Sequence, residues 1–284
     1  MTRVRFYQID AFTDIPFRGN PAAVCLLEQP HEAATLQAIA AEMNLSETAF
    51  LRRLNGDPWE ASTRLSLRWF TPQTEVRLCG HATLASAAAL FDAVGVRTKT
   101  LIFETLSGDL VARNRDGGIA LDFPIDVPRT CDAPEGVVTA LGVQSSAIVD
   151  AAYGATTQKL LLAFASAPEV SGLTPDFSAL LGVRTMDPYR GLIVTAPGPA
   201  PYDFTSRYFA PWVGIHEDPV TGTAHTVLTP YWARRLRKGA GDQDALHAYQ
   251  ASARGGELWV RLTGAGHDRV EIVGQATAVA DGYL

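Results

Sequence analysis

Two stretches of the sequence place a glycine at the start of a run of small apolar residues. Gly80 and His81 begin the first run, and Gly222 and Thr223 begin the second, 142 residues later. A helix N-terminus offers unpaired N–H groups and partial positive charge, and glycine lets an anion approach that backbone closely. Either glycine alone is better explained by a tight turn. Their repetition favours a paired site for one small carboxylate.

Glu47 is the first candidate acid/base. It precedes the strand-like run Thr48–Leu51. A carboxyl group in an apolar pocket has a raised pKa, which suits it to proton transfer near neutral pH. The segment by itself favours a solvated loop glutamate.

Asp218 and His81 are further candidates. Asp218 can orient a substrate amine or hydroxyl or hold a second proton, although an aspartate before proline is also typical of a turn. His81 lies in the first helical turn, where the helix N-terminus should keep the ring neutral and able to relay a proton. A capping or core histidine is the alternative. His225, one turn into the second helix, is predicted to be structural.

Cys79 also lies at a helix start, where a thiol has a lowered pKa and can act as a base. A two-thiol racemase needs a second cysteine at the matching place, which holds Thr221. Cys79 is therefore predicted to serve packing. Three cysteines without a CxxC pair argue against a thiolate zinc site and for a reducing cytosol, so no metal is predicted.

The elements around these residues are short strands and a few helices, which predicts an α+β protein. The predicted helices are Glu32–Met43, His81–Val94, Pro175–Leu181 (capped by Thr174) and Thr223–Lys238. The predicted strands are Val4–Ala11, Leu65–Phe70, Leu101–Glu104, Asp109–Arg113, Ile119–Phe123, Lys159–Phe164, Leu192–Thr195, Arg207–Ala210, Leu258–Leu262, Arg269–Val273 and Ala276–Ala280.

The two helices with glycine starts predict two related halves, each with a sheet around one central helix. We place the halves at residues 1–117 and 118–284, with the last strand able to return to the first half. His81–Val94 is apolar all round, which indicates burial on every side. Pro230 should bend its helix or leave a carbonyl near Thr226 unpaired.

The composition excludes several classes of protein. With 47% hydrophobic and 19% charged residues, the 284-residue chain is globular. A net charge of −6 speaks against a nucleic-acid binder. The longest apolar run, 85–91, is far below the roughly 20 residues that span a bilayer. No signal peptide is evident, so a cytoplasmic protein without membrane partners is expected.

Several motifs, in order and spacing, resemble the PhzF-like proteins of phenazine biosynthesis, within the diaminopimelate-epimerase-like fold. They are Ile9–Phe12, Gly19–Val24, Asn44–Thr48, Arg68–Pro72, Cys79–Thr83, Ser107–Gly108, Glu217–Gly222 and Gln250–Gly256. The resemblance implies two pseudo-symmetric halves, each a mostly antiparallel sheet or barrel rolled around a central helix, with the active site in the cleft between them. It also implies a homodimer and no cofactor.

The resemblance further implies roles for individual residues. The catalytic residues would be Glu47, His81 and Asp218, and the substrate-binding residues Ser46, Gly80, Gly222 and Thr223. The family has serine where this chain has Thr223, and the extra methyl group favours a different substrate.

The sequence therefore predicts an isomerase or epimerase without a cofactor. It would move a proton between carbons of a small anionic cyclic or amino acid, similar to the isomerisation of trans-2,3-dihydro-3-hydroxyanthranilate. Two alternatives are an isomerase or epimerase of another amino or hydroxy acid, and a non-catalytic small-ligand-binding protein on the same scaffold.

Overall fold

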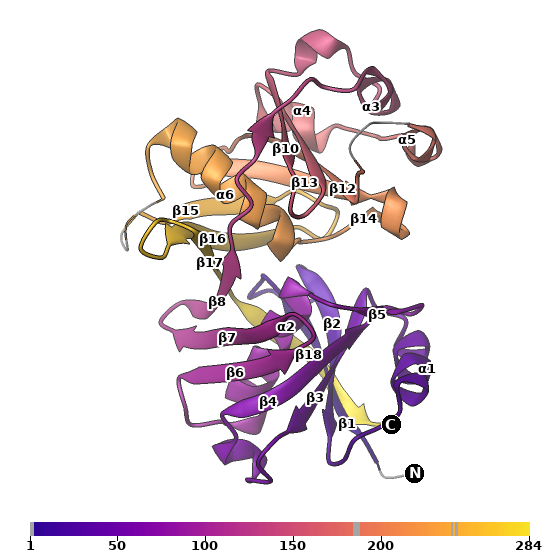
Figure 1. Cartoon of the computed structure of the whole chain (residues 1–284), viewed down its shortest axis with the longest axis vertical. Helices are drawn as coiled ribbons and strands as arrows, with labels where there is room; N and C mark the ends of the chain where they lie inside the picture. The colour runs from indigo at the N-terminus through magenta and orange to yellow at the C-terminus, as the bar shows by residue number, and fades with distance from the viewer. Residues whose placement is uncertain (1–2, 184–187, 240, 242–243) are drawn as a thin grey trace. The chain divides into compact units, whose positions relative to one another are not determined.

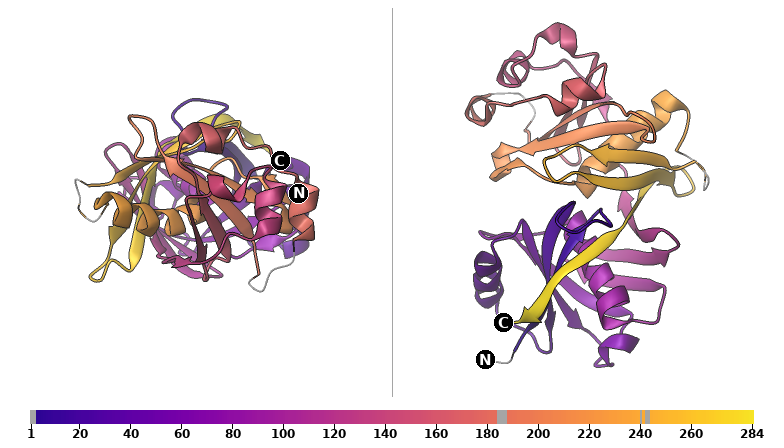
Figure 2. Two further views of the ribbon diagram at one scale, coloured as in Figure 1. Left: turned by 90° about the horizontal axis from the view of Figure 1, so that it is seen from above. Right: turned by 180° about the vertical axis from the view of Figure 1, so that it is seen from behind.

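The computed structural model describes residues 3–183, 188–239, 241 and 244–284, and the chain forms two compact units (Figure 1). The first unit contains residues 1–123 and 272–284, and the second contains residues 124–271. The chain leaves the first unit after the expected boundary at 117/118, because β8 (Gly118–Pro124) pairs with β7 (Gly108–Arg115). The final strand, β18 (Ala276–Tyr283), pairs with β1 (Arg5–Ala11) of the first unit (Figure 2).

The first unit is a mixed sheet with strand order β18-β1-β2-β3-β4-β6-β7-β8. The pairs β2–β3 and β4–β6 are parallel and the other pairs antiparallel. Its remaining elements are β2 (Asn20–Leu27), α1 (Ala33–Met43), β3 (Glu47–Arg53), η1 (Trp59–Ala61), β4 (Arg64–Phe70), β5 (Glu75–Val76), α2 (Gly80–Ala88), the π-helical η2 (Ala89–Val94) and β6 (Thr100–Thr105).

Helix α2 is the central helix of this unit, as its all-round apolar sequence predicts. It contacts strands β1, β2, β3, β7 and β18 (Figure 1). Every residue from Gly80 to Phe91 is buried. The helix does not stay α-helical to Val94, because its last turn widens into η2 and ends at Gly95 in the left-handed region (φ +81°).

The second unit has strand order β9-β10-β11-β12-β13-β15-β16, with β14 also paired to β13. Its elements are β9 (Arg129–Thr130), α3 (Glu135–Ala140), η3 (Ser145–Ala147), β10 (Asp150–Gly154), β11 (Lys159–Ala163), α4 (Ala167–Ser171), α5 (Phe177–Gly182), β12 (Gly191–Pro197), β13 (Phe204–Ala210), η4 (Pro211–Val213), β14 (Ile215–Glu217), α6 (Gly222–Leu236), β15 (Leu246–Gln250), β16 (Gly256–Thr263) and β17 (Arg269–Gly274), which ends in the first unit.

The two units repeat one another. Successive strand pairs in each unit are antiparallel, parallel, antiparallel, parallel and antiparallel. This order holds along β1, β2, β3, β4, β6 and β7 in the first unit and along β10, β11, β12, β13, β15 and β16 in the second. The hairpins before the two central helices also match. In the first, Arg68 forms a bidentate ion pair with Glu75, and in the second Arg207 does so with Glu217. The expectation of two pseudo-symmetric halves is thereby confirmed.

Proline changes the hydrogen bonding of α6. Pro230 has no N–H to donate to the carbonyl of Thr226. The backbone N–H of Asp126 donates to that carbonyl instead, at 3.2 Å, so it is not left unpaired. In the part of the chain that the structure describes, no helix has both the length and the apolar character needed to cross a membrane.

Helix α5 begins later than predicted. Its N-cap is Asp176, whose carboxylate accepts a hydrogen bond from the Ala179 N–H at 2.9 Å. The predicted start used Thr174 as the cap and Pro175 as the first helical residue. Asp176 replaces them because it supplies the side-chain acceptor that the exposed N–H groups need.

Candidate active site

Glu47 and His81 meet in the first unit. Glu47 begins β3, and His81 is the second residue of α2. Oε2 of Glu47 lies 3.2 Å from Nε2 of His81, and the two side chains are 12% and 6% exposed. The structure thus brings together two of the three predicted catalytic residues, in surroundings nearly without water.

The other ring nitrogen of His81 faces Asn20, the buried first residue of β2. The Asn20 amide Nδ2 lies 3.2 Å from Nδ1 of His81. An amide N–H only donates, so Nδ1 is the acceptor in this contact and the neutral ring then carries its proton on Nε2. Asn20 stands in the Gly19–Val24 motif, but nothing in the sequence assigned it a role.

Charge around His81 favours protonation. Burial alone would lower the pKa of His81, but the charge of the Glu47 carboxylate beside the ring holds it well above its usual value. The helix N-terminus alone predicted a neutral ring. The direction reverses because the Glu47 carboxylate lies in contact with the ring. Contact with Glu47 stabilises a proton on Nε2 in either charge state of the ring.

Cys79 lies beside the same ring, with Sγ 3.5 Å from Nδ1 of His81. Burial, followed by the charge of Glu47, raises the pKa of Cys79 to about 11. The group is therefore a neutral thiol at physiological pH, despite its place before a helix. This state agrees with the predicted packing role of Cys79.

Glu47, Cys79 and His81 are also the residues best placed to hold a metal. Among the described residues, they are the acidic, cysteine and histidine side chains whose donor atoms all lie within 4.8 Å of one another. The Cys79 sulfur lies 3.5 Å from Nδ1 and the Glu47 carboxylate 3.2 Å from Nε2, so the two groups approach different nitrogens of the ring.

Asp218 is held rigidly in the second unit, just before α6. The Thr221 hydroxyl donates to its carboxylate. The Gln250 amide donates to the Asp218 carbonyl at 2.8 Å and accepts from the Thr221 N–H at 2.9 Å. Gln250 lies in the quoted Gln250–Gly256 motif, but its contacts with Asp218 and Thr221 appear only in the fold. All three side chains are buried.

His225 completes this corner of α6. Its Nδ1–H donates to the Thr221 carbonyl at 2.8 Å. Burial lowers the pKa of His225 to about 4, so the ring stays neutral. In the first unit, the Thr83 hydroxyl makes the equivalent bond to the Cys79 carbonyl, at 2.5 Å. These contacts agree with a structural role for His225.

The predicted substrate-binding residues lie at the two helix starts and before β3. Gly80 and Gly222 are the first residues of α2 and α6, and both are buried. Neither N-cap residue uses its side chain to cap its helix. Thr223 and Ser46 are half-buried. Each unit therefore presents a helix N-terminus with no side-chain cap beside a buried carboxylate.

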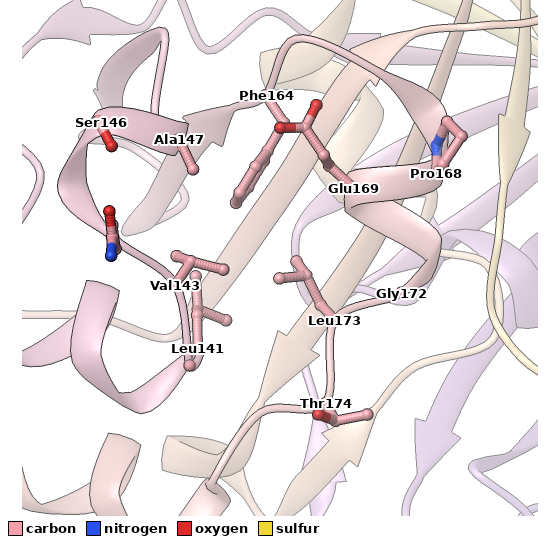
Figure 3. A pocket seen from close by; sticks show the side chains of 12 residues that line it. Leu141, Val143, Ser146, Ala147, Phe164, Pro168, Glu169, Gly172, Leu173 and Thr174 are labelled. Carbon is pink, nitrogen blue, oxygen red and sulfur yellow. The ribbon is translucent and has the colours of Figure 1, made fainter.

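A separate cavity of about 550 Å³ lies in the second unit (Figure 3). Its apolar lining includes Leu141, Val143, Phe164 and Leu173, and Glu169 is its charged lining residue. None of the predicted site residues lines it. The cavity is therefore distinct from the residues described above.

The model of the family "Phenazine biosynthesis-like protein" matches residues 9–282. The chain belongs to this family. A family relative, phenazine biosynthesis-like domain-containing protein 1 of Mus musculus, is 48% identical over 286 residues, covering 97% of this chain and 96% of the relative. A Pseudomonas aeruginosa protein named an uncharacterized isomerase is 44% identical over 278 residues, covering 98% and 97%.

Solved structures agree with this family membership. A PhzF-family protein of Enterococcus faecalis is 40% identical, has a TM-score of 0.88, and covers 100% of this chain and 99% of its own. A probable proline racemase of Agrobacterium radiobacter, at 13% identity, a TM-score of 0.62 and coverage of 99% and 92%, shows likeness of fold alone. The expected α+β, diaminopimelate-epimerase-like fold is confirmed.

Proposed function

We propose that this family member is an isomerase that needs no cofactor and moves a proton between carbons of a small carboxylate-bearing cyclic or amino acid. The observation that carries the proposal is the contact between Glu47 and His81 at the start of α2. The Glu47 carboxylate is 12% exposed and lies 3.2 Å from the His81 ring, and a positioned carboxylate of this kind can act as a general base.

In the proposed reaction, the Glu47 carboxylate removes a proton from an sp³ carbon. The electron pair left behind spreads over the conjugated system of the substrate. Glu47 then returns the proton to another carbon, so the product differs from the substrate only in the positions of that proton and of a double bond. The His81 ring, whose Nε2 lies 3.2 Å from Oε2 of Glu47, stabilises the charge of the carboxylate before and after each transfer.

The substrate carboxylate is proposed to lie against a helix N-terminus. The N-caps of α2 and α6 make no side-chain cap, and N–H groups at a helix start favour an anion. Gly80 and Gly222 keep these starts free of side chains. Asp218, held by the Thr221 hydroxyl, would orient an amine or hydroxyl of the substrate.

The named relatives support the reaction class. The Pseudomonas aeruginosa relative is named an isomerase, and the match covers 98% of this chain and 97% of the relative. The substrate is the open part of the proposal, with dihydro-hydroxyanthranilate as the reference compound. A homodimer remains part of the proposal, and size-exclusion chromatography with light scattering would test it.

The test is proton exchange at carbon. The protein is incubated in D₂O with dihydro-hydroxyanthranilate and a panel of cyclic amino acids, and proton NMR follows deuterium entering at carbon. Exchange or a shifted double bond with the wild type, lost in Glu47→Gln, is the expected result. Retained turnover in Glu47→Gln would exclude Glu47 as the base. Binding with neither deuterium entry nor a shifted double bond for any compound would instead favour the non-catalytic alternative.

A further inference from the structure

The repeat between the units shows what stands in the second unit where the first has Glu47. Thr48 of β3 pairs with Phe70 of β4, and Leu192 of β12 pairs with Phe209 of β13. One residue earlier in each strand, Glu47 therefore corresponds to Gly191. The second unit has no acid at the position that carries the acid of the first.

The neighbouring strand supplies a charged group at this place. In the first unit, Ala22 of β2 lies in register beside Glu47, and in the second unit Lys159 of β11 lies in register beside Gly191. Residues in register on parallel strands share one face of the sheet. Lys159 therefore points to the face of its sheet that corresponds to the Glu47 face.

Gly191 makes room for this arrangement. A Cβ at Gly191 would lie 2.0 Å from the Tyr208 hydroxyl, so the tyrosine occupies the space of the missing side chain. The Lys159 ammonium lies 5.5 Å from the centre of the Tyr208 ring. The Tyr208 carbonyl in turn accepts from the Asp218 N–H at 3.1 Å. Tyr208 is thus in contact with both Lys159 and the predicted site residue Asp218.

Lys159 is a largely buried cation, and none of the residues that the structure describes forms an ion pair with it. The residue is 6% exposed. In the parts of the chain that the structure describes, the ring of Tyr208 is its contact, and no carboxylate lies within 4.0 Å of its ammonium. The nearby Asp126 carboxylate accepts hydrogen bonds from the Thr157 N–H and hydroxyl, at 2.8 and 2.7 Å.

The charge of Lys159 is held in balance by its surroundings. Burial lowers the pKa of Lys159 to about 8, the carboxylates of Asp126 and Asp218 oppose this change, and Arg190 adds to it. A buried ammonium without a bonded anion is costly. An arriving carboxylate would remove that cost and gain a charge-assisted hydrogen bond.

We propose that Lys159 binds a carboxylate of the substrate in the second unit, beside Asp218, and so selects small acids over their neutral analogues. The identity of this carboxylate as a substrate group rests on the proposed function. The same face of the sheet would then carry a base in the first unit and, from the neighbouring strand, an anion-binding cation in the second.

The chain offers a clean readout, because it contains three lysines, at 99, 159 and 238. Protein labelled with ¹³C at lysine Cε gives one NMR signal for each, and their titration curves report the three pKa values. The probes are 2-aminobenzoate and 2-aminobenzamide, which share a shape and differ in charge. We expect 2-aminobenzoate to move the titration of Lys159 to higher pH and the amide to leave it in place. Lys99 and Lys238 should respond to neither.

Variants provide the second arm. Lys159→Met should weaken the binding of 2-aminobenzoate by at least about ten-fold, as loss of a hydrogen bond to a charged group predicts, and that of the amide by less than about two-fold. Lys159→Arg should retain most of the preference for the acid, and Lys99→Met, at an exposed position, should not change it.

Three results would overturn the proposal. One is a wild-type Lys159 signal that 2-aminobenzoate does not move, a measurement that needs no variant. Another is an equal loss of affinity for both probes in Lys159→Met. The third is loss of exchange activity with unchanged affinity, which would make Lys159 a proton carrier. Because the first two readouts measure binding, they stay informative if Glu47→Gln retains turnover and the proposed base fails.

Discussion

The bond between Thr221 and Asp218 gives a prediction that joins stability to the site. Thr221 is the N-cap of α6, yet its hydroxyl donates to the Asp218 carboxylate and does not cap the helix. Thr221→Val keeps the shape and removes that donor from a buried carboxylate. A hydrogen bond to a charged group contributes about 1.5–3 kcal/mol, and we expect the free energy of unfolding to fall by about that amount.

The assay is urea unfolding followed by tryptophan fluorescence, with the exchange assay as a second readout. Thr226→Val is the matched control, because its hydroxyl bonds to the Thr223 carbonyl, at 2.9 Å, within the same helix. This control should lose about 1 kcal/mol or less. Thr221→Ser should restore most of the wild-type stability. Equal losses in Thr221→Val and Thr226→Val would refute the idea that the Asp218 contact is the stronger one.

Three further predictions concern the first unit. Glu47→Gln should lower the pKa of His81, whose raised value depends in part on Glu47. A group whose pKa is raised in the folded state stabilises the fold fully below its unfolded pKa of about 6.5, and this contribution is lost as pH rises through the folded pKa. The free energy of unfolding of the wild type relative to the variant should therefore fall as pH rises, and a pH-independent difference would contradict this. Asn20→Leu removes the donor to Nδ1 of His81 and should change the ¹⁵N shifts of that ring toward a mixture of tautomers; unchanged shifts would exclude the positioning role. Cys79, buried and with its pKa raised to about 11, should resist iodoacetamide in the folded protein while the half-buried Cys131 reacts, as mass spectrometry of the alkylated protein would show; rapid labelling of Cys79 would point to a thiolate.

Much of the framework follows from local patterns. The two glycine-started helices are visible in sequence because small apolar residues repeat around the whole helix, which only a central helix tolerates. Strand β2 was not predicted, because Gly19 and Pro21 at its start are typical of a turn. Pro21 pairs with Asp10 of β1, whereas the parallel pairing of β2 with β3 starts one residue later, at Ala22. The N–H that proline lacks is therefore not needed by the parallel ladder, and Pro21 is tolerated.

The site was only partly visible. Glu47 and His81 are recognisable as chemical groups, but their contact depends on how β3 and α2 come together in the fold. Asn20 and Lys159 gave no local signal, since each is an ordinary polar residue in the first position of a strand. Their partners, His81 and Tyr208, lie far away in sequence. A sequence pattern indicates which side chains of a strand point to the core, but it does not indicate which distant residues those side chains contact.

The return of β18 to the first unit affects how the protein can be made. Strand β1 pairs with β2 on one side and with β18 on the other, so a nascent chain that still lacks β18 leaves β1 as an unprotected edge. Strand β18 follows the whole second unit in the chain and is therefore synthesised after it. The second unit can complete its own sheet during synthesis while the first stays open to pairing with other chains until β18 has been made.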